Sequence, residues 1–155
     1  MKVMTYVGTY TDAKKEGIHL FAADTDSGTF RPIGVVSGIE NPTYLALAKN
    51  RPLLYAAQSM PEFGTPAQNG AVAAYAIKGD TLVPINHKPV SVTAPCYVAL
   101  DPAEKALVFA EYTHAVAGVF NLNPDGSLAD TPPVIVKHTG SGPDTSRQEK
   151  AHAHC

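Results

Sequence analysis

A repeat of about fifty residues constrains the fold of this chain more than any other feature. Residues Asn41–Leu47 and Ala94–Leu100 share the pattern Pro-x-Tyr-x-Ala-Leu, and the same spacing places Leu53–Ala57 on Ala106–Ala110. A partial copy precedes both, because Met4–Gly8 has the apolar character of Leu53–Ala57. A chain built from such units folds by stacking them, since one unit cannot bury its own apolar faces.

Each full unit contains four short segments that are typical of β-strands. The first carries the Pro-x-Tyr motif, the second is a continuous apolar run, the third alternates, and the fourth follows a glycine turn. Pairs such as Ser27-Gly28 and Asp125-Gly126 favour hairpins, because a tight turn needs positive φ. Four such strands in about 45–50 residues match one propeller blade. The sequence therefore predicts an all-β fold of β-propeller blades, each a four-stranded antiparallel sheet. A β-sandwich and an open solenoid are the alternatives, and the repeat disfavours the sandwich.

The repeat also predicts how the chain is divided. We expect a partial blade over 1–40, full blades over 41–93 and 94–140, and the start of a next blade over 141–155. The partial blade lacks the innermost of the four strands. Tyr44 and Tyr97 recur with the repeat, so we interpret them as packing residues between blades. Unpaired strand edges invite pairing with other chains, so we expect self-association through open blade edges.

Composition and charge argue against several classes of partner. The 155 residues carry a formal net charge of −2, with 45% hydrophobic and 17% charged residues, as in globular proteins. Without a basic patch, neither nucleic acid nor an anionic membrane surface is an expected partner. The isolated Cys96 and Cys155 favour a reducing compartment, and Met1–Gly8 has the pattern of a strand rather than a signal peptide. We therefore expect a cytoplasmic protein.

Several motifs resemble a known family. They are Val7-Gly8-Thr9-Tyr10-Thr11, the repeated Pro-x-Tyr segments, and the run Gly140-Ser141-Gly142-Pro143 followed by Arg147-Gln148-Glu149-Lys150-Ala151-His152-Ala153-His154. In this order they resemble the bacterial 6-phosphogluconolactonases of the seven-bladed β-propeller lactonase family. The resemblance covers the whole chain, and the last run is its most specific part.

The resemblance implies hydrolysis of 6-phosphoglucono-1,5-lactone to 6-phosphogluconate, a step of the pentose phosphate pathway, with no cofactor. Members of the family are about twice as long as this chain, so about three of seven blades are expected here. A sister branch cycloisomerises carboxylated muconates, so a cycloisomerase, or a lactonase for another carboxylated lactone, is an alternative. A non-catalytic propeller that serves as an interaction scaffold is a second alternative.

The run from Arg147 to His154 contains the residue types that lactone hydrolysis needs. A base must activate water, a donor must stabilise the oxyanion, and an acid must protonate the leaving oxygen. His152 and His154 are candidates for base and acid, and Glu149 is a candidate base or an orienting group for a histidine. Arg147 is a candidate ligand for the phosphate or the oxyanion. We list these four as candidate catalytic residues, and Arg147, Gln148 and Glu111 as candidate substrate-binding residues.

The spacing of the two histidines predicts their arrangement. On a strand, His152 and His154 lie on one face and project into the same cleft, with Arg147 and Glu149 on the loop before it. Other interpretations remain open. Arg147 and Glu149 form only a surface ion pair in one, and the histidines pack between blades in another. In a third, the histidines bind zinc with ligands from elsewhere, because Cys155 would face away from them. We predict no metal.

Overall fold

The computed structural model describes residues 1–12, 14–65, 68–90 and 92–155. Within these residues the chain is almost entirely β-structure, with one short 3-10 helix, η1 (Pro61–Phe63), and no helix long and apolar enough to cross a membrane. The strands are β1 (Lys2–Gly8), β2 (Glu16–Asp24), β3 (Thr29–Ser37), β4 (Glu40–Leu47), β5 (Leu53–Ser59), β6 (Gly70–Lys78), β7 (Thr81–Pro89), β8 (Tyr97–Leu100), β9 (Ala106–Glu111), β10 (Val116–Asn121) and β11 (Val134–Lys137). The prediction of an all-β fold is confirmed.

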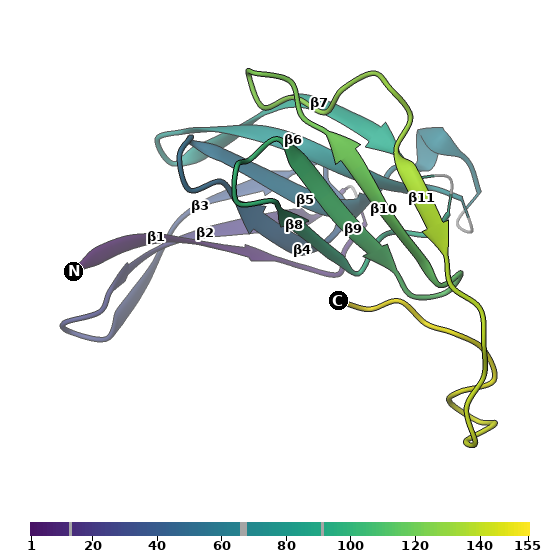
Figure 1. The fold of residues 1–155 in the computed structure, drawn as a ribbon. Helices are drawn as coiled ribbons and strands as arrows, with labels where there is room; N and C mark the ends of the chain where they lie inside the picture. The colour runs from purple at the N-terminus through teal and green to yellow at the C-terminus, as the bar shows by residue number, and fades with distance from the viewer. Residues whose placement is uncertain (13, 66–67, 91) are drawn as a thin grey trace.

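The strands form three antiparallel sheets in which neighbours in sequence are neighbours in space (Figure 1). The first sheet has the order β1-β2-β3, the second β4-β5-β6-β7 and the third β8-β9-β10-β11. Successive antiparallel strands joined in this way are the architecture of propeller blades, which confirms the predicted fold class.

The first sheet corresponds to the last three strands of the second sheet. β3 and β7 both contain the sequence Thr-x-x-Pro-Ile, and both show a register shift beside the proline, at Pro32 opposite Phe21 and at Pro84 opposite Tyr75. A proline has no N–H to donate to a ladder, so it is found at sheet edges and bulges. Since β3 matches β7, β1 takes the position that β5 holds in the second sheet.

The sheets stack face to face around two apolar clusters. The cluster between the first and second sheets contains Ile18, Leu20, Ile39, Leu54, Ala56, Ala73, Tyr75 and Leu82. The cluster between the second and third sheets contains Leu53, Tyr55, Ala57, Val72, Ala74, Val90, Val98, Leu107, Phe109, Val116, Phe120 and Leu128. The rings of Tyr44 and Tyr97 lie 4.7 Å apart across the second and third sheets, so the recurring tyrosine does pack between blades.

The outer strand of the third sheet begins later than the glycine turn predicts. Gly126 has φ of 87°, as the Asp-Gly turn requires, but β11 starts only at Val134. Leu128 explains the delay, because its side chain is fully buried between the sheets. The side chain of Asn86 holds it there, accepting from the N–H of Leu128 at 3.0 Å and donating to its carbonyl at 2.8 Å.

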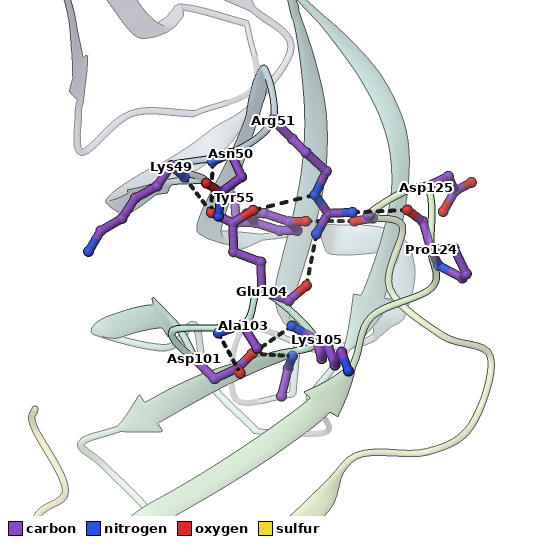
Figure 2. Close-up of polar contacts among 12 residues, drawn as sticks. Lys49, Asn50, Arg51, Tyr55, Asp101, Ala103, Glu104, Lys105, Pro124 and Asp125 are labelled. Atoms are coloured by element: carbon purple, nitrogen blue, oxygen red, sulfur yellow. Dashed lines mark hydrogen bonds and ion pairs between the residues drawn. The ribbon is translucent and has the colours of Figure 1, made fainter.

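A polar clamp joins the second and third sheets at the end where β4 turns into β5 (Figure 2). The buried carboxylate of Glu104 accepts hydrogen bonds from the backbone N–H of Lys49 at 2.5 Å and of Asn50 at 3.0 Å. Arg51 pairs with the same carboxylate at 3.4 Å, and its guanidinium also donates to the carbonyls of Glu104 and Pro124. These donors order two loops from different sheets around one side chain.

The clamp also affects the ionisation of Glu104. Partial burial opposes the charged form, but the N–H groups of Asn50 and Lys49 and the guanidinium of Arg51 outweigh it, so the pKa of Glu104 lies below its usual range. The side chain is held in place by the preceding turn, in which Asp101 accepts from the backbone N–H of Lys105 and Ala106 at 2.6 Å each (Figure 2). The clamp is therefore charged and prearranged at neutral pH.

Candidate active site

The motif residues lie at the end of the third sheet opposite the clamp. After β11 the chain leaves the sheet, forms a loop and turns back towards it (Figure 1). Residues 138–155 form no strand, so the expectation that His152 and His154 lie on one strand is wrong. The reason is that a strand needs a hydrogen-bonded neighbour, whereas the loop bonds within itself: Gly142 N–H donates to the carbonyl of Gln148 at 2.8 Å, and Gln148 N–H to that of Asp144 at 2.6 Å.

His152 nevertheless lies in a well-defined place. Its Nδ1 is 3.1 Å from the backbone carbonyl oxygen of Tyr112, and its Nε2 is 3.3 Å from a carboxylate oxygen of Glu149. Its ring stacks on the ring of Tyr112, with centroids 4.2 Å apart and planes 14° apart. Each ring nitrogen lies beside an acceptor, so a proton on either nitrogen has a partner.

Glu149 is exposed but has a defined charge state. A hydrogen bond from its own backbone N–H lowers the pKa of Glu149, slight desolvation opposes this, and the neighbouring His152 lowers it further. The carboxylate is therefore ionised at neutral pH and stands beside the imidazole of His152. Of the two roles expected for Glu149, base or orienting group for a histidine, this placement is compatible with the second.

His154 lies near His152 through the same aromatic ring. Its imidazole stands edge-on to Tyr112, with centroids 5.8 Å apart and planes 84° apart. The backbone beside it is close to Cys96, whose sulfur is 3.6 Å from the carbonyl oxygen of Ala153 and 3.4 Å from that of His154. Burial raises the pKa of the Cys96 thiol, so it remains a neutral donor to these carbonyls.

The histidines border a pocket of about 400 Å³ on the face of the third sheet that is turned away from the second. Its lining is largely apolar on the sheet side and polar on the loop side, and comprises Tyr97, Val108, Phe109, Ala110, Ala117, His138, His152, Ala153, His154 and Cys155. Both motif histidines therefore have a side next to open space, where a small molecule or water can reach them.

Glu111 is close to this group in sequence and space, but its carboxylate is enclosed. The side chain is fully buried and accepts from the N–H of Thr113 at 3.0 Å, the N–H of His114 at 2.7 Å and the hydroxyl of Thr93. The Nδ1 of His114 lies 3.3 Å from the same carboxylate. A substrate cannot reach Glu111 without displacing these partners, so the expected substrate contact does not fit this geometry.

Arg147 and Gln148 lie away from the two histidines. The side-chain carbonyl of Gln148 accepts from the N–H of Asp144 at 3.2 Å, which closes the loop on itself. Arg147 is exposed, and its side chain makes no hydrogen bond or ion pair with the residues that the structure describes. The structure thus gathers Glu149, His152 and His154, and leaves the guanidinium of Arg147 pointing to solvent.

Two features of this group were missed from the sequence. From the sequence, Tyr112 is assigned no role and Cys96 is interpreted only as an isolated thiol. No sequence signal marks either contact, since Tyr112 is forty residues from His152. Across the described ranges, no set of three or more His, Cys, Asp or Glu side chains is placed to hold a metal ion.

Consecutive antiparallel sheets of three or four strands, stacked face to face, define a β-propeller protein as the class. The model of the family described as "Lactonase, 7-bladed beta-propeller" matches residues 4–155. The chain therefore belongs to the seven-bladed β-propeller lactonase family, as the sequence motifs had indicated.

Known proteins are similar to this chain over almost all of its length. The chain is 36% identical over 155 residues to the 6-phosphogluconolactonase of Bacillus subtilis (strain 168), covering 99% of this chain and 42% of that protein. A crystal structure from Lactobacillus plantarum is similar with a TM-score of 0.81 at 32% identity, over 98% of this chain and 42% of its own. One from Bacteroides fragilis NCTC 9343 has a TM-score of 0.85 at 29% identity, over 99% and 41%. The chain thus spans well under half the length of these relatives.

Proposed function

We propose that this chain contributes to a hydrolase that opens a sugar lactone, with 6-phosphoglucono-1,5-lactone as substrate and 6-phosphogluconate as product. Membership of the lactonase family and the similarity to the Bacillus subtilis 6-phosphogluconolactonase support this proposal. The same similarity supports a role in the pentose phosphate pathway. Cys96 and Cys155 are free thiols, which is in keeping with a place in the reducing cytoplasm.

The observation that carries the proposal is the chain of contacts from Glu149 through His152 to the Tyr112 carbonyl, with His154 beside it. Hydrolysis of a lactone needs a base for the water, a donor for the oxyanion and a proton for the leaving ring oxygen. His152 and His154 lie in the same loop but have different neighbours, so one imidazole can act as the acid and the other as the base.

We propose the following division of these tasks. His152, whose ring nitrogens lie beside the Glu149 carboxylate and the Tyr112 carbonyl, stabilises the developing oxyanion and gives a proton to the leaving ring oxygen. His154 pairs with no carboxylate among the residues that the structure describes, and it takes the proton from the attacking water. Arg147, whose guanidinium is unengaged, binds the substrate phosphate, because its planar fork suits phosphate oxygens.

The test measures lactone opening above its spontaneous rate. Product 6-phosphogluconate is followed with a coupled dehydrogenase for the 155-residue chain, His152→Ala, His154→Ala and the control His87→Ala, which lies beside Phe63 on another sheet. We expect both motif variants to lose about 100-fold or more of the enzymatic rate, the range of general acid–base catalysis, and the control to keep it. In parallel, 6-phosphogluconate should shift the imidazole NMR signals of His152 and His154. A chain that neither accelerates the reaction nor shows these shifts overturns the proposal.

We also propose that the chain self-associates through the open face of its first sheet. Val7, His19 and Val35 lie side by side across β1, β2 and β3, and Phe21 stacks on Phe30 on the same face, with ring centroids 4.3 Å apart. Val7, Phe30 and Val35 are exposed, which is unfavourable for apolar side chains in water.

A further inference from the structure

The side chain of His152 has a defined orientation although residues 138–155 form no helix or strand. A histidine on an irregular loop has many rotamers, and catalytic groups work only when held close to one geometry. Glu149 contacts His152 from within the same loop, and the remaining contacts come from outside it. They belong to the turn of residues 111–115, which joins β9 to β10.

Hydrogen bonds to one buried side chain hold the turn of residues 111–115 in a single conformation. The fully buried carboxylate of Glu111 receives the N–H groups of Thr113 and His114 and the hydroxyl of Thr93. A buried carboxylate that lost these donors would be strongly destabilised, so the donors and the carboxylate hold one another in place. Ala115 closes the turn with φ of 56°, a conformation that a non-glycine residue keeps only when its surroundings enforce it.

The turn presents two parts of Tyr112 to the loop. The carbonyl oxygen lies 3.1 Å from Nδ1 of His152, and this hydrogen bond restricts the side-chain torsion angles of the histidine. The aromatic ring lies flat against His152 and edge-on to His154, at centroid distances of 4.2 and 5.8 Å. Tyr112 therefore contacts His152 through both its ring and its backbone carbonyl, and His154 through its ring.

We propose that Tyr112, held by the buried carboxylate of Glu111, is the positioning residue that orients His152 and His154. The proposal rests on the proposed function for its catalytic meaning, but its geometric content stands without it. The Tyr112 carbonyl accepts from Nδ1 of His152, so Nε2 is the nitrogen turned towards Glu149. Glu111 is then a positioning residue that acts through the turn, in place of the substrate contact expected from the sequence.

The first measurement uses the unaltered chain. Nuclear Overhauser contacts are expected between the Tyr112 ring protons and the ring protons of both histidines, and the stacked His152 protons should show an upfield ring-current shift. Absence of these contacts in the folded chain overturns the proposal directly, with no variant that has to fold.

The second measurement separates positioning from general stability. Tyr112→Phe keeps the ring and backbone and should retain both histidine signals, whereas Tyr112→Leu should abolish the upfield shift. Tyr10→Leu, at a site 89% exposed, is the matched control and should change neither. In lactone hydrolysis Tyr112→Leu should lower kcat by about 10- to 100-fold with little effect on KM, and Tyr112→Phe should restore it. Unchanged histidine signals in a folded Tyr112→Leu protein refute the inference.

Glu111→Gln tests the support beneath Tyr112. The amide retains the shape of the carboxylate but turns an NH₂ group towards backbone donors, so the turn should loosen and the His152 signals should move towards those of Tyr112→Leu. His152 signals that stay in place contradict the role of Glu111. If the histidine contacts are present but the chain opens no lactone and binds no 6-phosphogluconate, the proposed function fails while the positioning geometry stands.

Discussion

The hydroxyl of Tyr55 donates a 2.7 Å hydrogen bond to the backbone carbonyl of Gly126. Tyr55 belongs to β5 of the second sheet and is fully buried, whereas Gly126 lies in the loop after β10 of the third sheet. The bond crosses the interface between two blades inside their shared core. It therefore reports on the stacking of the blades rather than on the stability of either sheet alone.

Tyr55→Phe should lower the free energy of unfolding by about 1–2 kcal/mol, because the Gly126 carbonyl would lose its partner in a buried place. Equilibrium urea unfolding followed by circular dichroism measures the change. Tyr10→Phe removes a hydroxyl that is exposed to solvent and should leave the midpoint unchanged. Equal midpoints for Tyr55→Phe and the unaltered chain would show that the interface does not depend on this bond.

Glu104→Gln should make the chain less stable at neutral pH and less sensitive to acid. Since the folded pKa of Glu104 lies below its usual value of 4.5, its charge stabilises the fold above that pH, and this contribution is lost as pH falls through the folded pKa. Urea midpoints at pH 7 and pH 3.5 test the prediction, with Glu62→Gln as the control. The difference between Glu104→Gln and the unaltered chain should shrink at the lower pH. A difference that is constant with pH would assign the effect to packing.

Tyr75 should make the fold sensitive to alkali. Burial raises the pKa of Tyr75 from 10.0 to about 12, so the folded state retains a proton that the unfolded state releases. Its contribution is complete below pH 10 and is lost as pH rises towards 12, at up to about 1.4 kcal/mol per pH unit. Unfolding measured at pH 9, 10 and 11 should show this decline. Tyr75→Phe should make the decline shallower, and an unchanged slope would refute the assignment.

Self-association should be visible as a dependence of the sedimentation coefficient on concentration. Val35 is 42% exposed on the open face of the first sheet. Val35→Lys places a charge there, and a second copy that binds this face would have to remove water from that charge. We expect this variant to sediment as a smaller species than the unaltered chain at the same concentration. A chain that sediments as a monomer at every concentration contradicts the proposal.

The strands were predictable because each unit repeats its own local signals. Apolar runs bounded by glycine turns recur through the chain, and the two tyrosines of the Pro-x-Tyr motif do meet between sheets. The late start of β11 was not predictable, since it depends on Leu128 entering a core that Asn86 of another sheet helps to shape. Local patterns report the strand, whereas its first residue depends on packing between units.

The candidate site was predictable in its members more than in its geometry. The loop motif correctly indicated that Glu149 and the histidines belong together, but the pairing partner that would make their segment a strand is absent among the described residues. Glu111 was expected to bind substrate, whereas its carboxylate is enclosed by its own turn. Its burial and its bond with Thr93 depend on the neighbouring unit, and Tyr112 contacts residues forty positions away. Contacts across such separations leave no periodic trace in the sequence.

Glu104 and Glu111 flank the strand β9, one before its start and the other at its end, roughly 20 Å apart at the rise of an extended chain. One buried acid fastens two blades, and the other shapes the turn beneath the histidines. Distant sites of this kind change free energies almost additively. Substitutions around Glu104 should therefore change the contact between the two blades with little effect on the turn at Glu111, so the stability of the blade interface and the placement of His152 can vary independently.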